Sequence, residues 1–176
     1  MLDEKISVII PTLNDPLIDQ VVAGVQSQMA DAGEIVVVGR DDVGRVPVGI
    51  GIRFLETEQP VTAPVARNLG IQAATGNTLV FIDSDCLPRP GWLAGLLNRL
   101  ASGEDVVIGG VISPTDHYWV LAYNISMFHE FMTHTQPGFR RYSPTLNLAV
   151  RQKVIQKVGL MDENLPRGQD LSLIHI

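Results

Sequence analysis

Cysteine is nearly absent from this chain of 176 residues, since Cys86 is the only one. A single cysteine excludes a disulfide within the chain and suits a reducing compartment. The sequence also lacks a run of about 18 apolar residues, the length that a membrane-spanning helix needs. Residues 1–5 are acidic and lead straight into an apolar run, so they do not resemble a signal peptide. We therefore expect a cytoplasmic protein, with the inner face of the membrane as the alternative location.

Positive charge is scarce. Lys and Arg number 13 against 19 Asp and Glu, which gives a net charge of −6. This balance argues against a nucleic acid as the main partner, because binding a phosphate backbone requires a basic surface. A single nucleotide remains compatible with it, since a metal ion can offset the charge of a small ligand. The apolar fraction of 45% suits one globular domain with a buried core.

Several familiar motifs are missing as well. The sequence has no GxxxxGK[ST] phosphate loop and no GxSxG nucleophile motif, and Gly49-Ile50-Gly51 lacks the third glycine of a dinucleotide fingerprint. His129 and His134 stand five residues apart, whereas the zinc motif HExxH needs a spacing of four. The sequence therefore has no phosphate loop, no GxSxG nucleophile motif, no dinucleotide fingerprint and no HExxH zinc motif.

Short β-branched runs alternate with helical patterns along the chain. Asp15 is expected to cap the first helix and Gly76 to end the second. This alternation predicts an α/β fold with a mostly parallel central sheet flanked by helices. Ligands of such sheets bind at the carboxyl ends of the strands. The expected strands are residues 6–10, 34–38, 52–55, 78–82, 106–108 and 145–150, and the expected helices are residues 17–29, 63–74, 92–100, 117–134 and 151–158.

Two carboxylates follow the strand at residues 78–82. Asp83 and Asp85 stand either side of Ser84, so an extended backbone would point both carboxylates to one side. Paired carboxylate oxygens at a strand end suit Mg²⁺ or Mn²⁺, with phosphate oxygens completing the coordination. The alternative is a simple strand-end turn, because Asp and Ser are good turn residues.

Other polar residues allow two interpretations each. Arg67 could reach a phosphate and Asn68 a ribose or backbone group, although a solvated helix face is the simpler interpretation. Asp170 could be a catalytic base or a solvated surface carboxylate.

An aromatic-rich segment could be core or a groove wall, with a membrane-facing or acceptor-facing helix as the alternative. Its aromatic residues are Trp119, Tyr123, Phe128 and Phe131.

Taken together, these pieces resemble the family 2 glycosyltransferases, which have a GT-A-type fold. Each piece alone is weak, but their order and spacing match along nearly the whole chain. The pieces are residues 6–14 (ISVIIPTLN), 34–38 (EIVVV), 66–71 (ARNLGI), 74–77 (ATGN), 81–85 (FIDSD), 147–151 (NLAVR), 158–163 (VGLMDE) and 168–170 (GQD).

The resemblance implies the transfer of a sugar, with inversion, from a UDP-, GDP- or dTDP-sugar to a saccharide or lipid-linked acceptor. It also implies that Mg²⁺ or Mn²⁺ assists the reaction and that the product belongs to cell-envelope polysaccharide synthesis. It implies that Asp170 is the base and that Asp83 and Asp85 hold the metal. Peripheral membrane contact is a further expectation. The residues that it places in the nucleotide-sugar site are Pro11, Thr12, Asn14, Arg67, Asp83 and Ser84.

The chain departs from the family pattern in three places. Gly39-Arg40 stand where many relatives have paired aspartates that contact the base, and Asp41-Asp42 come two residues later. Gln169 replaces the Glu of the family's Glu-Asp pair. Residues 171–176 resemble a translated sequencing adapter, so we expect residues 1–170 to form a truncated catalytic domain followed by a non-native tail.

These departures keep two alternatives open. A non-catalytic nucleotide-sugar-binding module or an inactive fragment would also explain the Gln169 substitution. A phosphohydrolase with an aspartate nucleophile is the third hypothesis, although its motif usually opens the chain and has Thr or Val where Leu87 stands.

Overall fold

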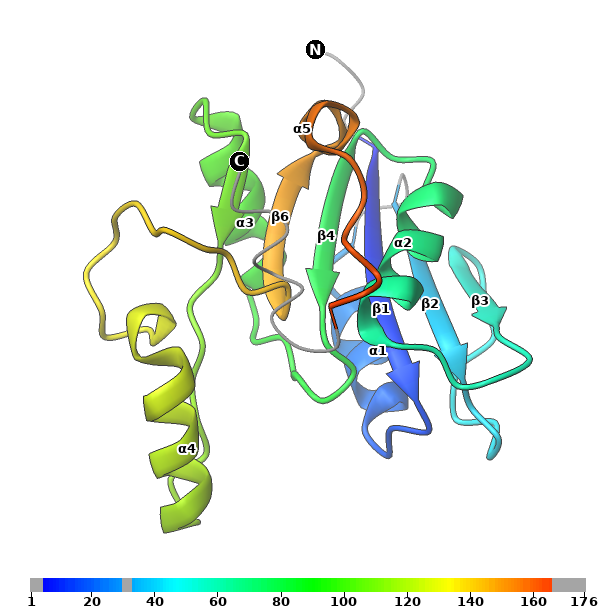
Figure 1. Cartoon of the computed structure of the whole chain (residues 1–176), viewed down its shortest axis with the longest axis horizontal. Coiled ribbons are helices and arrows are strands. Elements are labelled where there is room, and N and C mark those ends of the chain that lie inside the picture. The colour runs from blue at the N-terminus through cyan, green and yellow to red at the C-terminus, as the bar shows by residue number, and fades with distance from the viewer. Residues whose placement is uncertain (1–4, 30–32, 166–176) are drawn as a thin grey trace.

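The computed structural model describes residues 5–29 and 33–165. Its centre is a sheet in the order β3-β2-β1-β4-β6-β5 (Figure 1). All neighbouring strands pair in parallel except at β6, which runs antiparallel to β4 and to β5. The strands are β1 (Ile6–Leu13), β2 (Glu34–Arg40), β3 (Ile52–Glu56), β4 (Thr78–Ile82), β5 (Val106–Ile108) and β6 (Asn147–Arg151).

Helices cover both faces of the sheet. On one face, Val8 and Ile10 pack against α1 (Ile18–Gln26) and α3 (Trp92–Ala101). On the other face, Ile9 and Phe81 pack in a cluster that includes residues of α2 (Ala63–Ala73) and α5 (Gln152–Val158). Alternate side chains of one strand thus enter opposite layers, and both layers are apolar because both are covered. The predicted α/β fold, with a mostly parallel sheet flanked by helices, is confirmed.

Several predicted boundaries are wrong by a few residues. Asp15 accepts a hydrogen bond from the Leu17 amide at 2.8 Å, but the regular helix begins only at Ile18. The last strand begins at Asn147 and not at residue 145, because residues 145–146 form a turn. The strand at Val106–Ile108 has its predicted bounds, lies at the sheet edge and is only partly buried.

Gly76 does not end α2 in the predicted way. The helix ends at Ala73, and the φ of Gly76 is not positive. Its small size is needed for another reason, because a Cβ at this position would lie 2.6 Å from the Lys5 carbonyl oxygen and 2.7 Å from the Ser7 amide nitrogen. Its amide donates to Ser7 Oγ at 2.9 Å. Gly76 therefore lets the turn before β4 pass close to β1.

The aromatic-rich segment forms α4 (Tyr118–Phe128) and a short 3₁₀ turn, η1 (His129–Phe131), and residues 132–134 lie beyond the helix. Figure 1 shows α4 projecting from the domain. None of its residues is buried, and Trp119 is 81% exposed. The interpretation of Trp119 and Tyr123 as core is wrong, whereas Phe131 is buried against Tyr142. Within the described ranges, no helix is long and apolar enough to cross a membrane.

Candidate active site

Three neighbouring strands bring the predicted polar residues to one edge of the sheet. Because β2, β1 and β4 are adjacent and parallel, their carboxyl ends meet there. Asp83 follows β4, Asn14 follows β1, and Asp41 follows β2. Asp83, Asn14 and Asp41 therefore lie at the edge where ligands of such sheets bind.

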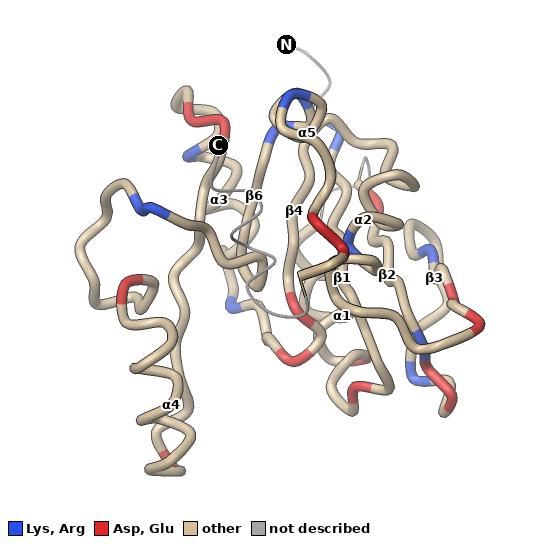
Figure 2. Tube along the Cα trace, in the orientation of Figure 1, with Lys and Arg blue, Asp and Glu red and all other residues tan. Residues whose placement is uncertain are grey.

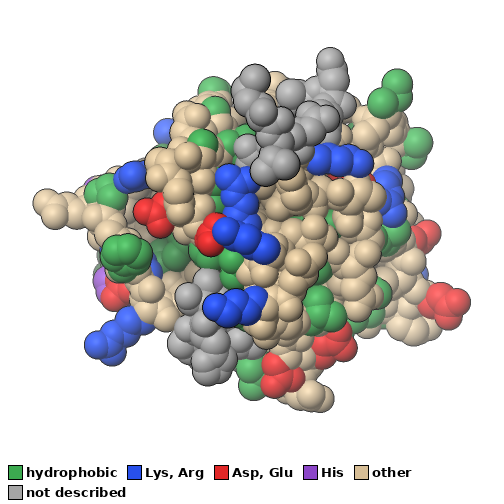
Figure 3. Space-filling model, turned by 90° about the horizontal axis from the view of Figure 1, so that it is seen from above, with side chains coloured by type: hydrophobic (Ala, Val, Ile, Leu, Met, Phe, Trp, Pro, Cys, Tyr) green, Lys and Arg blue, Asp and Glu red, His purple; other side chains and the backbone are tan. Residues whose placement is uncertain are grey.

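Figure 2 shows acidic positions along the lower edge of the domain, below β4 and α1, with basic positions near the lower end of β2. By their place in the sequence, Asp15 follows β1, and Asp83 and Asp85 follow β4. Figure 3 looks onto the opposite end and shows several Lys and Arg side chains on that surface. The carboxylates that follow β1 and β4 favour a cation or a metal-bound anion over a free phosphate.

The Asp83-Ser84-Asp85 motif forms a turn, so the extended backbone that would align both carboxylates does not persist. The Cys86 amide donates to the Asp83 carbonyl oxygen at 3.1 Å and closes this turn. Ser84 Oγ donates to Asp15 Oδ2 at 3.1 Å, which ties the turn to the loop after β1. Asp85 is exposed at its tip. A turn held in this way fixes Asp83 next to the sheet and presents Asp85 outward.

Arg67 is the best-defined partner of the motif. Its guanidinium Nη2 lies 2.5 Å from Asp83 Oδ1, and the Arg67 side chain is 3% exposed while that of Asp83 is 32% exposed. The interpretation of Arg67 as part of a solvated helix face is therefore wrong. Arg67 Nε and Nη1 are buried, and no described residue accepts a hydrogen bond from them. A buried guanidinium beside a half-exposed carboxylate restricts the orientation of Asp83.

The two aspartates fit a divalent cation that a bound phosphate helps to hold. Among the described residues, no group of three His, Cys, Asp or Glu side chains forms a metal cluster. Two carboxylates are nevertheless what Mg²⁺ commonly uses when substrate phosphates supply further ligands. Cys86 does not offer a thiolate, because burial, and then the charges of Asp85 and Asp83, raise the pKa of its thiol. The site thus supplies oxygen ligands only.

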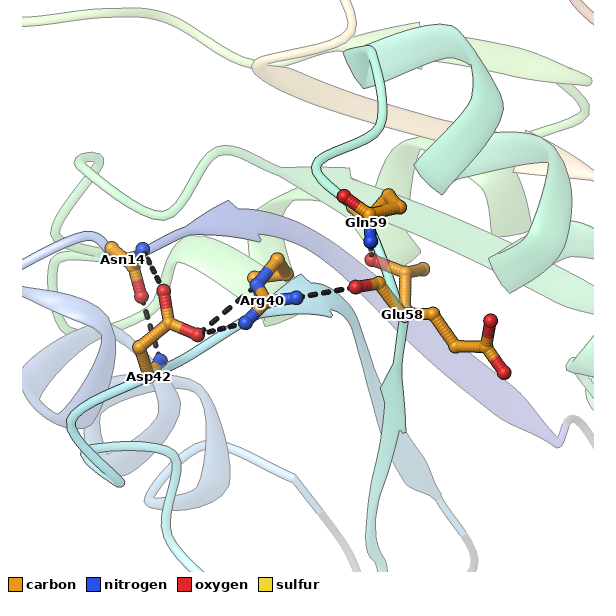
Figure 4. Close-up of polar contacts among 6 residues, drawn as sticks. Asn14, Arg40, Asp42, Glu58 and Gln59 are labelled. Carbon is orange, nitrogen blue, oxygen red and sulfur yellow. Dashed lines mark hydrogen bonds and ion pairs between the residues drawn. The ribbon is translucent and has the colours of Figure 1, made fainter.

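A second polar cluster lies at the ends of β1 and β2 (Figure 4). Asn14 donates from Nδ2 to Asp42 Oδ2 at 2.8 Å, and its Oδ1 accepts from the Asp42 amide at 2.7 Å. Arg40 pairs with Asp42 Oδ1 and also donates to the Glu58 carbonyl oxygen at 2.5 Å. The hydrogen bond from Arg40, followed by that from Asn14, lowers the pKa of the Asp42 carboxyl. Asp42 and Arg40 together therefore link the segments that follow β1, β2 and β3.

Gly39 is constrained to glycine by the backbone at the end of β2. Its φ is +134°, and a Cβ there would lie 1.9 Å from the Thr12 carbonyl oxygen. A larger residue would therefore be strained and would clash with β1. Asp41, two residues later, is buried and accepts from the Val46 amide at 2.6 Å. Asp41 thus holds the loop after β2.

The remaining predicted residues lie near this edge or outside the described ranges. Pro11 is half-buried within β1 and pairs with Val38, while Thr12 is buried and its Oγ1 has no hydrogen-bond partner among the described residues. Asp170 and Gln169 lie outside the described residues. The sequence interpretation gave no role to Asn147, which accepts from Trp92 Nε1 at 2.8 Å and donates to the Gly110 carbonyl oxygen at 3.1 Å. Its position opposite Ile82 was visible only once β6 was paired with β4.

The sequence comparison decides the family. Residues 7–159 match the family described as "Glycosyl transferase family 2". The chain belongs to this family. It is 33% identical over 107 residues to the glycosyltransferase AglE of Haloferax volcanii, a match that covers 60% of this chain and 35% of AglE. The predicted membership of family 2 is confirmed.

Two solved structures share the fold of this chain. A mannosyltransferase from Pyrobaculum calidifontis, in complex with GDP-Man and Mn²⁺, superimposes with a TM-score of 0.68 at 22% identity, covering 95% of this chain and 50% of that one. TarS residues 1–349 of S. aureus, in complex with UDP-GlcNAc, gives a TM-score of 0.71 at 19% identity, covering 97% and 52%. These TM-scores establish the GT-A fold. The chain spans about half of each of these two structures.

Proposed function

We propose that this glycosyltransferase binds a nucleotide-diphosphate sugar at the carboxyl edge of β1, β2 and β4 and transfers its sugar, with inversion, to an acceptor hydroxyl. The observation that carries the proposal is the pairing of buried Arg67 with Asp83, because it holds one carboxylate of an exposed acidic turn in a fixed orientation. The GDP-Man and Mn²⁺ bound in one structural neighbour and the UDP-GlcNAc bound in the other support the same class of ligand.

The geometry favours a division of the donor between two clusters. The diphosphate would lie at Asp83, Ser84 and Asp85, and the nucleoside would extend past Thr12 toward Asn14, following the strand order from β4 to β1. A divalent cation, Mg²⁺ or Mn²⁺, would be held by Asp85 and Asp83 and would neutralise charge on the departing diphosphate. Pro11 would line the strand side of the nucleoside site.

The acceptor side of the reaction involves Asp170. Its carboxylate would take the proton from the acceptor hydroxyl, whose oxygen would then attack the anomeric carbon from the face opposite the nucleotide. The bond to the diphosphate breaks as the new glycosidic bond forms, which inverts the anomeric centre. Saccharides and lipid-linked saccharides are the acceptor classes that we propose. Residues 1–170 would form this catalytic unit, and the exposed α4 is the surface that we assign to a peripheral membrane contact.

A donor screen tests the proposal. Thermal shift of the chain with UDP-, GDP- and dTDP-sugars, each with and without Mn²⁺, should identify one donor that raises the unfolding temperature only with the metal. Turnover of that donor, with NMR assignment of the product anomer, then tests transfer and inversion. Binding without turnover would support the non-catalytic module instead. No stabilisation by any nucleotide sugar would contradict the proposal.

A further inference from the structure

The acidic loop, residues 83–91, connects β4 to α3 and carries both aspartates of the candidate cation site. Figure 1 shows it below β4, at the edge where β1 and β4 end. Arg67 fixes Asp83 through their ion pair. Among the described residues, the Asp85 carboxylate has one partner, the Cys86 thiol, whose sulfur lies 3.5 Å from Asp85 Oδ1. The position of Asp85 therefore depends on the shape of the loop backbone.

Asn147, the first residue of β6, contacts both ends of the acidic loop. Its backbone lies opposite Ile82, which is the last residue of β4 and the one before Asp83. Its side-chain Oδ1 accepts a hydrogen bond at 2.8 Å from Nε1 of Trp92, the first residue of α3. One asparagine thus closes the base of the loop, since it holds the residue before the loop and the residue after it.

The segment after β5 holds the Asn147 amide in this orientation. Its Nδ2 donates to the Gly110 carbonyl oxygen at 3.1 Å, and the Asn147 carbonyl oxygen accepts from the Gly109 amide at 2.9 Å. Gly109 leaves room for the side chain, because a Cβ there would lie 2.5 Å from Asn147 Cγ. Asn147 is 8% exposed, so water competes little for these hydrogen bonds. A methyl group at Gly109 would therefore displace the amide.

We propose that Asn147 is a positioning residue for the cation site, because it closes the base of the acidic loop and so holds Asp85 where it can share a divalent cation with Asp83. Its amide is occupied by Trp92 and Gly110, so its effect passes through the loop and not through contact with the cation. Residues that hold metal ligands in place commonly set the metal affinity. This inference rests on the proposed function, because it concerns the cation of that same site.

Three variants remove the hydrogen bond between Asn147 and Trp92 in different ways. Asn147→Ala deletes the amide, Trp92→Phe removes the indole N–H but keeps an aromatic ring, and Gly109→Ala displaces the amide. Gly95→Ala, at a glycine of α3 with open space around its Cβ, is the control for Gly109→Ala. Ile155→Ala removes a buried side chain of α5, at the opposite end of the sheet, and is the control for a general loss of stability.

Two measurements report on the cation site and on the loop separately. Isothermal titration with UDP, GDP and dTDP as probes, at several concentrations of Mn²⁺, gives the apparent Kd of the metal. Hydrogen exchange of the Cys86 amide, which donates to the Asp83 carbonyl oxygen at 3.1 Å, monitors the loop without metal or nucleotide.

We expect the three variants to raise the apparent Kd of Mn²⁺ by roughly tenfold and to speed exchange of the Cys86 amide. Gly95→Ala and Ile155→Ala should leave both quantities unchanged. The double variant Asn147→Ala/Trp92→Phe should lose no more Mn²⁺ affinity than Asn147→Ala alone, because both changes remove the same hydrogen bond.

Unchanged Mn²⁺ affinity in the three variants would overturn the inference, even if their stability falls. An equal loss of affinity in Ile155→Ala, or additive losses in the double variant, would also overturn it. Failure of the proposed function is seen separately, because the unsubstituted chain would then bind none of the three nucleotides with Mn²⁺. In that case unaltered exchange of the Cys86 amide in Asn147→Ala would still show that Asn147 does not hold the loop.

Discussion

Acid should weaken this fold through one buried carboxylate, Glu34. Burial raises the pKa of Glu34, but hydrogen bonds from Thr75 and Ser7 and the pairing with Arg53 outweigh it and lower the pKa from 4.5 to about 2. The hydrogen bonds are short: Ser7 Oγ at 2.7 Å, the Thr75 amide at 2.6 Å and Thr75 Oγ1 at 2.7 Å. Together they fasten the turn between α2 and β4 to the first strands, so Glu34 supports the helix that carries Arg67.

The pKa difference sets the size and the pH range of the effect. Because the folded pKa lies below the unfolded one, the unfolded chain binds more protons between these two values, and stability falls as the pH drops from about 4.5 toward about 2. At about 1.4 kcal/mol per pH unit, ionised Glu34 contributes up to about 3 kcal/mol to the free energy of unfolding above pH 5. The Glu34 side chain is 10% exposed, so solvent screens its charge little. Most of this contribution to the free energy of unfolding should therefore be observed.

Urea unfolding of the Glu34→Gln variant and of the unsubstituted chain, at several pH values from 7 to 2.5, measures this contribution. We expect a difference of about 2–3 kcal/mol at pH 7 that shrinks steadily below pH 4.5, because protonation removes the same charge from the unsubstituted chain. Glu58→Gln, at an exposed glutamate, serves as the control and should show no such difference. A difference for Glu34→Gln that stays constant from pH 7 to 2.5 would refute the assignment.

Two further changes test the backbone and the ion pair at the site edge. Gly39→Ala should destabilise the fold by more than about 3 kcal/mol, since a positive φ and a clash with the Thr12 carbonyl oxygen act together. Gly95→Ala, with open space around its Cβ, should instead stabilise α3 by about 0.5–1 kcal/mol. Thermal unfolding compares the two variants, and equal effects would count against backbone strain at Gly39. Arg67→Ala should cost about 1–3 kcal/mol in urea unfolding, because it leaves Asp83 without its buried partner. Arg67→Lys should recover part of this loss, and a fully stable Arg67→Ala variant would show that the pair does not hold the motif.

Much of the fold was predictable because hydrophobic periodicity reports burial directly. Residues 6–10 and 78–82 are apolar except for Ser7 and Thr78, which indicates strands covered on both faces. The placement of Asp83 and Asn14 at one edge followed from parallel pairing alone. The direction of β6 did not follow, because a strand of five residues carries no signal of its orientation, and only the pairing of Ile82 with Asn147 reveals it.

Side-chain partners were the part that sequence reasoning could not supply. Arg67 looked like a surface residue because a lone arginine on a helix usually is one, and its partner lies 16 positions away. Asn68 bonds to residues more than 90 positions away, so no local pattern marks it. The exposure of α4 was hidden for a different reason. The segment from Tyr118 to Phe128 has no charged face. The sequence of such an apolar helix does not distinguish a buried helix from one that projects from the domain.

The most direct test of the central claim is the binding of a nucleotide sugar to an Asp85→Asn variant, measured by isothermal titration with and without Mn²⁺. Asp105→Asn, which alters a carboxylate paired with Lys153 at the opposite end of the sheet, is the control. The proposed function predicts that Asp85→Asn weakens Mn²⁺-dependent donor binding by roughly tenfold or more while Asp105→Asn leaves it unchanged. Equal, metal-dependent donor binding by both variants would contradict it.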